Sequence, residues 1–504
     1  MSTQYKIFTT LVIVWMAVAA SGCKKLVEVP APNTSITLSE VFTSNAHANS
    51  AMAGLYSKMM SNSGSLTFSN GAISIYAGLS SDELLNFSGT TNLMDYQFYT
   101  NQLTSANGPV ASYLWTPAYS VVYGANACIE GLTAAAPDAL DDSIRNELTG
   151  EAKFIRAFCY FYLTNLFGDV PIVLSTDFNK TSLLAKSPQA DVYKQIISDL
   201  KDAQSLLPKD FSVGKGERIR ANYWAATALL ARVYLYQKDW ADAEAQASAV
   251  IGNSLFSLPT LANAFLKNSS ESILQFQENA TVLPYNTTWE AYEFVPTFRY
   301  TTYDPITQAS LINPFLFPSY AAFLVAPYCL TNSFMTNFET GDKRRSTWTD
   351  STATPSTAPY NSVPYYFAFK YTLKVSTLNG AITQYYTVLR LAEQYLIRAE
   401  ARAQQGTNLT GAASDLNAVR TRAGLANTSA STSTDLLTAV AHERQVELFA
   451  EWGHRWLDLK RTGQASSVLS ALSYKKPWSD NWLLYPIPVL DITDDPNLIQ
   501  NTGY

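Results

Sequence analysis

Residues 143–171, SIRNELTGEAKFIRAFCYFYLTNLFGDVP, carry the clearest secondary-structure pattern of the chain. Their apolar side chains recur at spacings of three and four residues, which places on one helix face Ile144, Leu148, Ala152, Ile155, Cys159, Tyr162 and Leu166. Gly168 and Pro171 follow where a helix-ending glycine and proline are expected. The pattern predicts a helix over residues 143–166 whose apolar face packs on a core.

Further helical patterns flank this helix, at residues 112–133, 189–207 and 220–237. Residues 223–251 carry small and aromatic residues in an order similar to a tetratricopeptide helix pair, with a turn at Lys238-Asp239. A related pattern covers residues 386–424, where Gly406 separates two helices. We therefore predict a mostly α fold, in which tetratricopeptide-like helix pairs form an α-superhelical scaffold.

The region 253–383 interrupts these helices. It is rich in Pro, Thr, Ser and Asn, and its aromatic residues cluster between Tyr285 and Tyr303 and between Tyr360 and Tyr371. Irregular segments held by a rigid scaffold often carry binding sites. We predict that this loop-rich, aromatic-rich subregion meets the ligand.

The composition excludes several classes of protein. The chain has 504 residues, of which 13% are aromatic and 15% charged, and a formal net charge of -6. This charged fraction is below the ~25% of an ordinary soluble domain. Many aromatics argue against a disordered chain, and the acidic balance argues against a nucleic-acid partner. The remaining polarity suits neutral hydroxylated ligands.

The N-terminus has the features of an export signal. Lys6 precedes an apolar run, residues 7–20, which is shorter than the ~20 residues of a membrane span. The run ends in Ala20-Ser21-Gly22-Cys23, which resembles the lipobox of bacterial lipoproteins. We predict a lipoprotein signal peptide over residues 1–22 and a lipidated Cys23 that anchors the mature chain to a membrane. The alternative is an ordinary cleavage site beside an incidental cysteine.

Motifs for catalysis or metal binding are absent from the sequence. It has no HExxH motif and no Gly-x-Ser-x-Gly elbow, and no cluster is formed by its histidines, His47, His442 and His454. Three cysteines remain after Cys23, an odd number that leaves at most one disulfide among Cys128, Cys159 and Cys329. We expect a binding protein without metal or cofactor.

Four blocks of sequence carry a specific family resemblance. They are EAKFIRAFCYF (151–161) with FGDVP (167–171), RLAEQYLIRAEA (390–401) with LNAVRTRAGL (416–425), ERQVELFAE (443–451) with GHRWLDLKR (453–461), and YPIP (485–488) with QNTGY (500–504). Together they resemble the SusD/RagB family of outer-membrane nutrient-binding lipoproteins.

The resemblance implies a cell-surface protein that binds oligosaccharide or another nutrient without covalent chemistry. It also implies a partner, a SusC-like TonB-dependent outer-membrane transporter, over which the protein sits as a lid. The predicted division of the mature chain is an N-terminal SusD-like helical region, 23–252, and a C-terminal SusD/RagB region, 253–504. The latter is loop-rich over 253–383 and helical over 384–504, and both regions are expected to pack as one globule.

Two features depart from the family pattern. Glu451-Trp452-Gly453 stands where the family often has Glu-Gly, so the glycine is displaced by one position. Lys24 and Lys25 follow Cys23, where acidic residues often accompany export to the cell surface. The second departure bears on the outward orientation and leaves the predicted anchor unchanged.

Charged residues of the third block predict ion pairs. Glu443, Glu447, Glu451 and Arg455 follow at four-residue spacing, which predicts one helix face where only the last two form a favourable pair. The other acids need cations from other helices. We predict structural ion pairs among Arg398, Glu400, Arg420, Glu443, Glu447, Glu451, Arg455 and Asp458. The alternative is a charged ligand site.

Ligand contacts are predicted from the chemistry of sugars. A flat aromatic ring covers the apolar face of a sugar, while neighbouring polar groups bond its hydroxyls. Two sets fit, Asp82, Glu83, Asn86 and Tyr96 in the N-terminal part, and Asn286, Trp289 and Tyr292 in the loop-rich part. A weaker candidate is Trp348, beside a basic run, Lys343-Arg344-Arg345, of the kind that usually forms a solvated turn. The alternative is that these aromatics pack a loop core.

Other functions remain open at this point. One is a tetratricopeptide-like scaffold that binds protein, or a peptide-binding component of an importer. The other is a lipid-anchored glycan hydrolase, which would need two opposed carboxylates.

Overall fold

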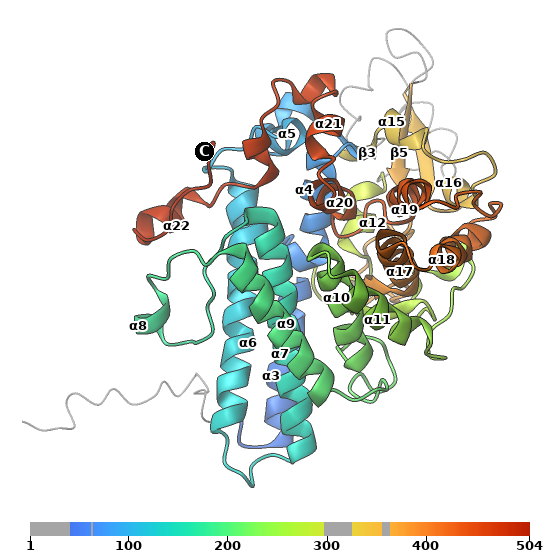
Figure 1. The fold of residues 1–504 in the computed structure, drawn as a ribbon. Coiled ribbons are helices and arrows are strands. Elements are labelled where there is room, and N and C mark those ends of the chain that lie inside the picture. The colour runs from blue at the N-terminus through green and yellow to red at the C-terminus, as the bar shows by residue number, and fades with distance from the viewer. Residues whose placement is uncertain (1–40, 62–63, 297–324, 355–362) are drawn as a thin grey trace, which may run out of the picture.

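The computed structural model describes residues 41–61, 64–296, 325–354 and 363–504. Within these ranges the mostly α-helical fold is confirmed (Figure 1). None of the helices described there has both the length and the apolar character that crossing a membrane requires. Outside the described residues lie Cys23 and several predicted loop aromatics, Phe298, Tyr300, Tyr303 and Tyr360.

A continuous stack of helices forms the scaffold, and each member packs on the next. In order, they are α6 (Thr116–Ala134), α7 (Asp142–Phe167), α9 (Gln189–Leu206), α10 (Tyr223–Tyr236), α11 (Trp240–Ile251), α17 (Leu391–Gln405), α18 (Leu409–Arg422) and α19 (Ser433–Glu447). Two of the pairs, α10 with α11 and α17 with α18, are those predicted as tetratricopeptide-like. The loop-rich region is inserted between α11 and α17, which pack on each other.

Local sequence explains where these helices begin and end. Asn222 caps α10, because its side-chain oxygen accepts from the amides of Trp224 (3.1 Å) and Ala225 (3.0 Å). Lys238 has φ 59° in the tight turn before α11. Gly168 ends α7 with φ 78°, and a Cβ there would lie 2.8 Å from a methyl of Leu484.

Shorter elements surround the stack. The remaining α-helices are α3 (Asn45–Ser61), α4 (Ile73–Ser80), α5 (Leu93–Thr100), α8 (Phe178–Thr181), α12 (Trp289–Phe294), α15 (Asn332–Met335), α16 (Lys343–Thr347), α20 (His454–Arg461), α21 (Ala465–Leu469) and α22 (Val489–Asp494). The described ranges also contain two π-helices, η3 (Phe68–Ala72) and η5 (Val110–Trp115), and four 3-10 turns, η4 (Gly89–Thr91), η6 (Leu261–Asn263), η7 (Ser473–Lys475) and η8 (Asp480–Leu483).

In the part of the chain that the structure describes, two small antiparallel sheets lie beside the helices. The first has the strand order β1-β3-β5-β4, from β1 (Leu84–Asn86), β3 (Tyr328–Leu330), β5 (Pro364–Ala368) and β4 (Thr349–Ala353). In its register Leu84 pairs with Leu330 and Asn86 with Tyr328. The second sheet pairs β2 (Ser272–Phe276) with β6 (Tyr386–Arg390). The first sheet thereby joins the N-terminal part to the loop-rich region.

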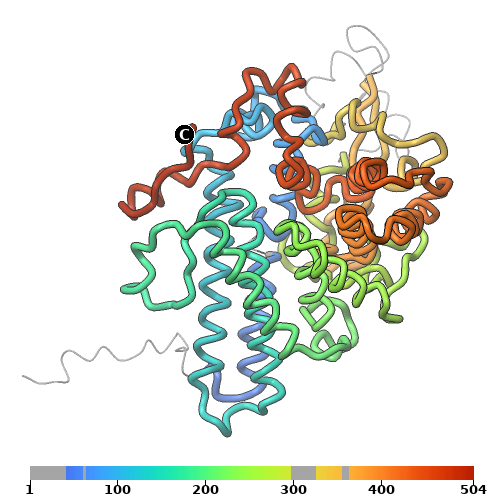
Figure 2. The backbone as a smooth tube through the Cα atoms, viewed as in Figure 1, coloured from blue at the N-terminus to red at the C-terminus, as the bar shows by residue number. Residues whose placement is uncertain are grey.

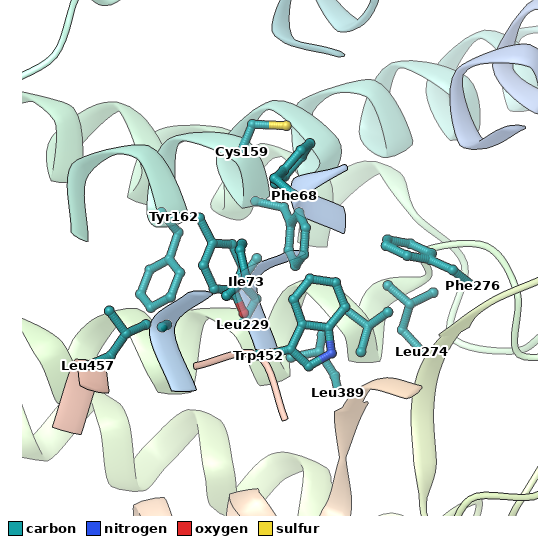
Figure 3. Close-up of a cluster of buried hydrophobic side chains, with 14 of the residues drawn as sticks. Phe68, Ile73, Cys159, Tyr162, Leu229, Leu274, Phe276, Leu389, Trp452 and Leu457 are labelled. Carbon is teal, nitrogen blue, oxygen red and sulfur yellow. The ribbon is translucent and has the colours of Figure 1, made fainter. Parts of the chain in front are cut away.

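The core gathers side chains from distant parts of the chain. Figure 3 shows Trp452 among apolar residues from α7, α10 and the second sheet. The Trp452 ring stacks on Tyr386 at 4.7 Å and meets Phe158 edge-on at 5.3 Å. Figure 2 shows the blue segment that contains α4 beside the red segment that contains α20, and these two helices pack on each other.

The predicted single helix over residues 443–455 is wrong. Helix α19 ends at Glu447, and α20 begins only at His454. Ala450, Trp452 and Gly453 all have positive φ in the turn between them. The turn carries the Trp452 side chain into the core, and a Cβ on Gly453 would lie only 2.6 Å from the Ala77 Cβ. The displaced glycine of the third block is therefore required by its close approach to α4.

Candidate functional site

A cleft of 430 Å³ lies where α4, α5, η5 and β3 meet. The first three elements belong to the N-terminal part, while β3 belongs to the loop-rich region. Its lining is mainly tyrosine, amide, hydroxyl and carboxyl groups, from Leu66, Tyr76, Asn92, Met94, Asp95, Gly108, Pro109, Ser112, Tyr113 and Tyr328. Among these, Lys and Arg are absent. This lining suits an uncharged polar ligand.

Short-range hydrogen bonds hold the wall formed by α5. Asn92 caps this helix, because its Oδ1 accepts from the Asp95 amide at 3.3 Å. Asn107 then ties the following loop to the helix, donating to the Met94 carbonyl (3.0 Å) and to Gln97 Oε1 (2.7 Å). These hydrogen bonds join α5 to the following loop, and Met94 is 48% exposed on this wall.

Two tyrosines provide an aromatic face. Tyr113 lies on η5 and stacks on Tyr76 of α4, with ring centroids 6.1 Å apart and planes within 12°. Tyr76 is buried, whereas Tyr113 is half-buried, so part of Tyr113 is open to a ligand. A π-helix widens the helical turn and is often found at functional sites. Here it introduces Tyr113 and the exposed Ser112 into the cleft.

Asp95 is the central polar group of the cleft. It is 4% exposed, and its Oδ2 accepts from the Tyr328 hydroxyl and from Asn92 Nδ2, each at 2.7 Å. Burial raises the pKa of Asp95, and the Tyr328 hydrogen bond offsets part of that rise. Burial also raises the pKa of Tyr328 well above its ordinary value, so this hydroxyl remains a donor. Asp95 is thus fixed in place as an acceptor.

A second carboxyl stands behind this wall on α12. Burial raises the pKa of Glu293 to about 7, Lys374 opposes the rise and Asp95 adds to it. Phe294, the next residue, meets the Tyr328 ring edge-on at 6.5 Å. Helix α12 therefore supports the cleft from the side of β3.

Of the predicted N-terminal ligand residues, Asn86 and Tyr96 lie next to the cleft and do not line it. Asn86 pairs with Tyr328 across the sheet, and its Oδ1 accepts from the Ser88 amide at 3.1 Å. Tyr96 follows Asp95 on α5, but its ring faces Tyr99 at 6.2 Å.

The predicted residues of the loop-rich part have mainly structural contacts. Asn286 is buried and bonds to the Ala381 carbonyl (3.1 Å). Trp289 is 6% exposed, and its Nε1 has no hydrogen-bond partner among the described residues. Tyr292 is half-buried beneath Lys374, whose Nζ lies 4.8 Å from the ring centroid. None of the three is in the cleft lining.

The structure places three other predicted ligand residues away from the cleft. Asp82 forms a two-point ion pair with Arg455, with both N–O distances 2.7 Å. Glu83 is buried and accepts from the Ala450 amide at 2.9 Å, and burial raises its pKa to about 8. Trp348 is 1% exposed, and its Nε1 donates to the Leu261 carbonyl at 3.0 Å. These three groups contact the scaffold, and none of them lines the cleft.

The predicted charged residues lie in a buried network between helices. Arg344 Nη1 lies 2.6 Å from Glu443 Oε1 and 2.9 Å from Glu447 Oε2. Arg390 bonds Glu447 at 2.6 Å and Glu451 at 2.7 Å. The nearby arginines, first Arg422 and then Arg390, hold the pKa of Glu447 well below its usual range against the effect of burial. The Glu447 carboxylate therefore stays ionised inside the protein.

The other predicted charges pair nearby, and the helix-face pair of Glu451 with Arg455 does not form. Arg398 bonds Asp415 at 2.6 Å, and Arg420 bonds Glu443 at 3.3 Å. Asp458 lies 2.7 Å from both Arg444 and Arg461, and Arg461 also pairs with Glu400. The turn after Glu447 separates Glu451 from Arg455. Glu451 pairs with Arg390 and Lys370, and Arg455 pairs with Asp82.

None of the residues that line the cleft was among the ligand residues predicted from the sequence. Asn92 and Asp95 form a helix cap with the spacing Asn-x-x-Asp, a local signal that could have placed the start of α5. Tyr113 lies in a helical sequence pattern, which does not distinguish it from a tyrosine of the core. Its position in the π-helix η5 is known only from the structure. Tyr328 reaches the cleft through strand pairing across more than 200 residues, which no local pattern reveals.

The described residues contain neither a disulfide nor a group of side chains arranged to bind a metal ion. Cys128, Cys159 and Cys329 are free and buried. Burial raises the pKa of the Cys128 thiol to about 12. No group of three or more His, Cys, Asp or Glu side chains is arranged to hold a metal ion in the described ranges.

Known families match both parts of the chain. The family described as "SusD family" matches residues 276–504, and that described as "Starch-binding associating with outer membrane" matches residues 33–235. The chain belongs to the SusD/RagB family. The resemblance of the four blocks is thereby confirmed.

Individual relatives match different shares of the chain. SusD-like protein P25 of Formosa agariphila is 25% identical over 99% of this chain and 100% of its own. The starch-binding protein SusD of Bacteroides thetaiotaomicron is 34% identical, over 23% of this chain and 21% of its own. A solved laminarin binding SusD-like protein has a TM-score of 0.73 and 25% identity, over 92% of this chain and 100% of that one. This SusD/RagB member therefore shares the fold of that protein over most of its length.

Proposed function

We propose that this protein binds a neutral oligosaccharide in the cleft between α5, η5 and β3. The arrangement that carries the proposal is the stacked Tyr113–Tyr76 pair beside Asp95. An aromatic face covers the C–H surface of a sugar, and a fixed carboxyl accepts from its hydroxyls. Asn92 and Ser112, both exposed, add an amide and a hydroxyl at the rim.

The ligand class is supported by the charge of the cleft and by relatives. No cation lines the cleft, so an anionic ligand would gain nothing from its described walls. Laminarin is bound by a structural relative and starch by a sequence relative, according to their names. Glucans of the laminarin and starch types are therefore the first ligands to test.

Isothermal titration of the mature chain tests the proposal. Laminari-oligosaccharide, malto-oligosaccharide and a mixed peptide pool serve as ligands. We expect saturable binding of at least one glucan and no release of reducing ends on prolonged incubation. Tyr123→Ala is a matched control, because Tyr123 is a 55% exposed tyrosine of α6 outside the cleft.

Other results would favour other functions. Binding of peptides alone would favour an interaction scaffold or a peptide importer, and newly formed reducing ends would establish a hydrolase. Glucan binding that is unaffected by Tyr113→Ala would place the site outside this cleft.

Delivery to a transporter and anchoring by lipid complete the proposed function. We infer that the bound glycan passes to a SusC-like TonB-dependent barrel in the outer membrane, as is known for the family. Purification of the tagged full chain from detergent-solubilised membranes should recover such a barrel. Cys23→Ala should release the chain from the membrane fraction, and retention would contradict the lipid anchor. Protease treatment of intact cells would report whether the chain faces outward.

A further inference from the structure

A second cavity, of 470 Å³, lies between α3 and the end of β2. It shares no lining residue with the cleft between α5, η5 and β3, called the glycan cleft below. Its lining combines apolar residues, Met60, Phe276 and Ile382, with Ser57 and the consecutive polar residues Gln277, Glu278 and Asn279. A cavity of this size accepts a ligand as large as a monosaccharide or an amino acid.

Glu278 is the feature of this cavity that the fold does not explain. It is 4% exposed, and its Oε1 has no hydrogen-bond partner among the described residues. A buried polar atom without a partner is rare in native proteins because it loses its bonds to water. Its neighbour Gln277, in contrast, donates to the Tyr385 hydroxyl at 3.3 Å.

The surrounding charges do not neutralise Glu278. Arg220 is the one cation in the described lining, and it is engaged by Glu151, with Nε 2.8 Å from Oε2. Glu290 on α12 adds a second buried carboxyl nearby, whose Oε2 also has no partner among the described residues. Burial, and then the charge of Glu290, raise the pKa of Glu278 well above its ordinary value. The lining of this cavity thus includes a buried carboxyl, Glu278, whose Oε1 has no donor among the described residues.

We propose that this cavity is a second ligand site, which binds a small molecule through a protonated primary amine placed against Glu278. An ammonium group supplies both the donors and the positive charge that the carboxyl lacks. Phe276 and Met60 would cover the carbon frame of the ligand, while Ser57 and Asn279 would bond its other polar groups. An amino sugar and a free amino acid share this chemistry.

Calorimetric titration with glucosamine, glucose and lysine tests the site. Glucosamine and glucose differ only by an ammonium in place of a hydroxyl, so glucose should bind at least about tenfold more weakly. Lysine without glucosamine binding would assign the site to amino acids. Because binding ionises Glu278, titration in two buffers of different ionisation enthalpy should show proton release.

Glu278→Gln keeps the shape of the side chain and removes its charge. This variant should lose at least about tenfold in amine affinity while it keeps the glucan affinity and the melting temperature of the parent. Tyr123→Ala should change neither affinity. Equal affinity for glucose and glucosamine, binding that the variant retains, or no binding of any amine would overturn the proposal. The last result would mean that water alone occupies the cavity.

The second site and the glycan cleft can fail separately. If Glu278→Gln loses stability, the difference between glucosamine and glucose on the parent protein, with its proton release, still decides the question. Glucan binding without amine binding would remove only the second site, and the reverse would remove only the proposed glycan cleft.

Discussion

The charged network beneath α19 and the cleft beside α5 use polar groups in opposite ways. In the network, Arg344, Arg390 and Glu447 are buried and satisfy one another. In the cleft, Tyr113 and Asn92 remain accessible, and no cation is present in the described lining. The family-like sequence blocks thus stabilise the fold, while the cleft is formed mainly by residues outside them.

The largest expected effect is a loss of stability on replacing the buried Arg344, compared with its exposed neighbour Arg345. Arg344→Ala would leave Asp342, Glu443 and Glu447 without their shared partner, because Arg344 is 0% exposed and bonds all three. Breaking a buried network of this kind costs about 3–5 kcal/mol of unfolding free energy. Arg345→Ala is the control, since Arg345 is exposed and should cost at most about 0.5 kcal/mol. Equal losses in denaturant melts would show that the network contributes little.

Arg455→Ala should lower stability without weakening glycan binding. The substitution leaves Asp82 without its two hydrogen bonds of 2.7 Å, at the contact between α20 and the start of β1. We expect a loss of about 1–3 kcal/mol in chemical unfolding, and an unchanged affinity for the glucan in the folded protein. An unchanged melting curve together with lost binding would move this pair from the scaffold to the ligand site.

Tyr113→Ala, in contrast, should weaken glucan binding more than it lowers stability. Removing the half-buried ring takes away the accessible member of the stacked pair, and the glucan affinity should fall about tenfold or more. The free energy of unfolding should fall by less than for Arg344→Ala, because part of the Tyr113 ring already faces solvent. Titration beside Tyr123→Ala measures the affinity, and equal affinities for the two variants would argue against an aromatic platform.

The sequence predicted the scaffold better than the cleft for a physical reason. Helical periodicity is local, so α7 and the pairs α10–α11 and α17–α18 could be predicted from apolar spacing alone. The partners of Arg344 lie 99 and 103 residues away, so its basic run was interpreted as a solvated turn. The run begins the short helix α16 and does not form a turn; Lys343 and Arg345 are exposed, as expected, whereas Arg344 is buried.

The aromatic candidates show the same limit. Trp348 and Trp289 have the chemistry of sugar platforms, but burial decides whether a ring can reach a ligand. Trp348 is enclosed by the network, with Lys370 Nζ 4.9 Å from its ring centroid. The sequence around Tyr113 indicates only a helix, whereas the structure places this residue in the π-helix η5, where it lines the cleft.

The smallest expected effect tests whether the charge of Asp95 matters in the cleft. Asp95→Asn keeps an oxygen that can accept from Tyr328 and Asn92, and it replaces the remaining carboxylate oxygen with a donor. A hydrogen bond to a charged acceptor exceeds its neutral equivalent by about 1 kcal/mol, so the glucan affinity should fall roughly fivefold.

A matching pH dependence should appear in the parent protein. Burial raises the pKa of Asp95 in the free protein, so protonation begins at a higher pH than for an exposed aspartate. Glucan affinity should therefore be constant near neutral pH and fall as acidification carries the pH through this raised pKa, whereas Asp95→Asn should show no such fall. Parallel pH profiles for the two proteins would assign any acid sensitivity to another group and would leave Asp95 with a purely structural contact to Tyr328. In that case the cleft, like the network, would use its carboxylate to hold the fold, and the contrast between the two regions would rest on the tyrosines alone.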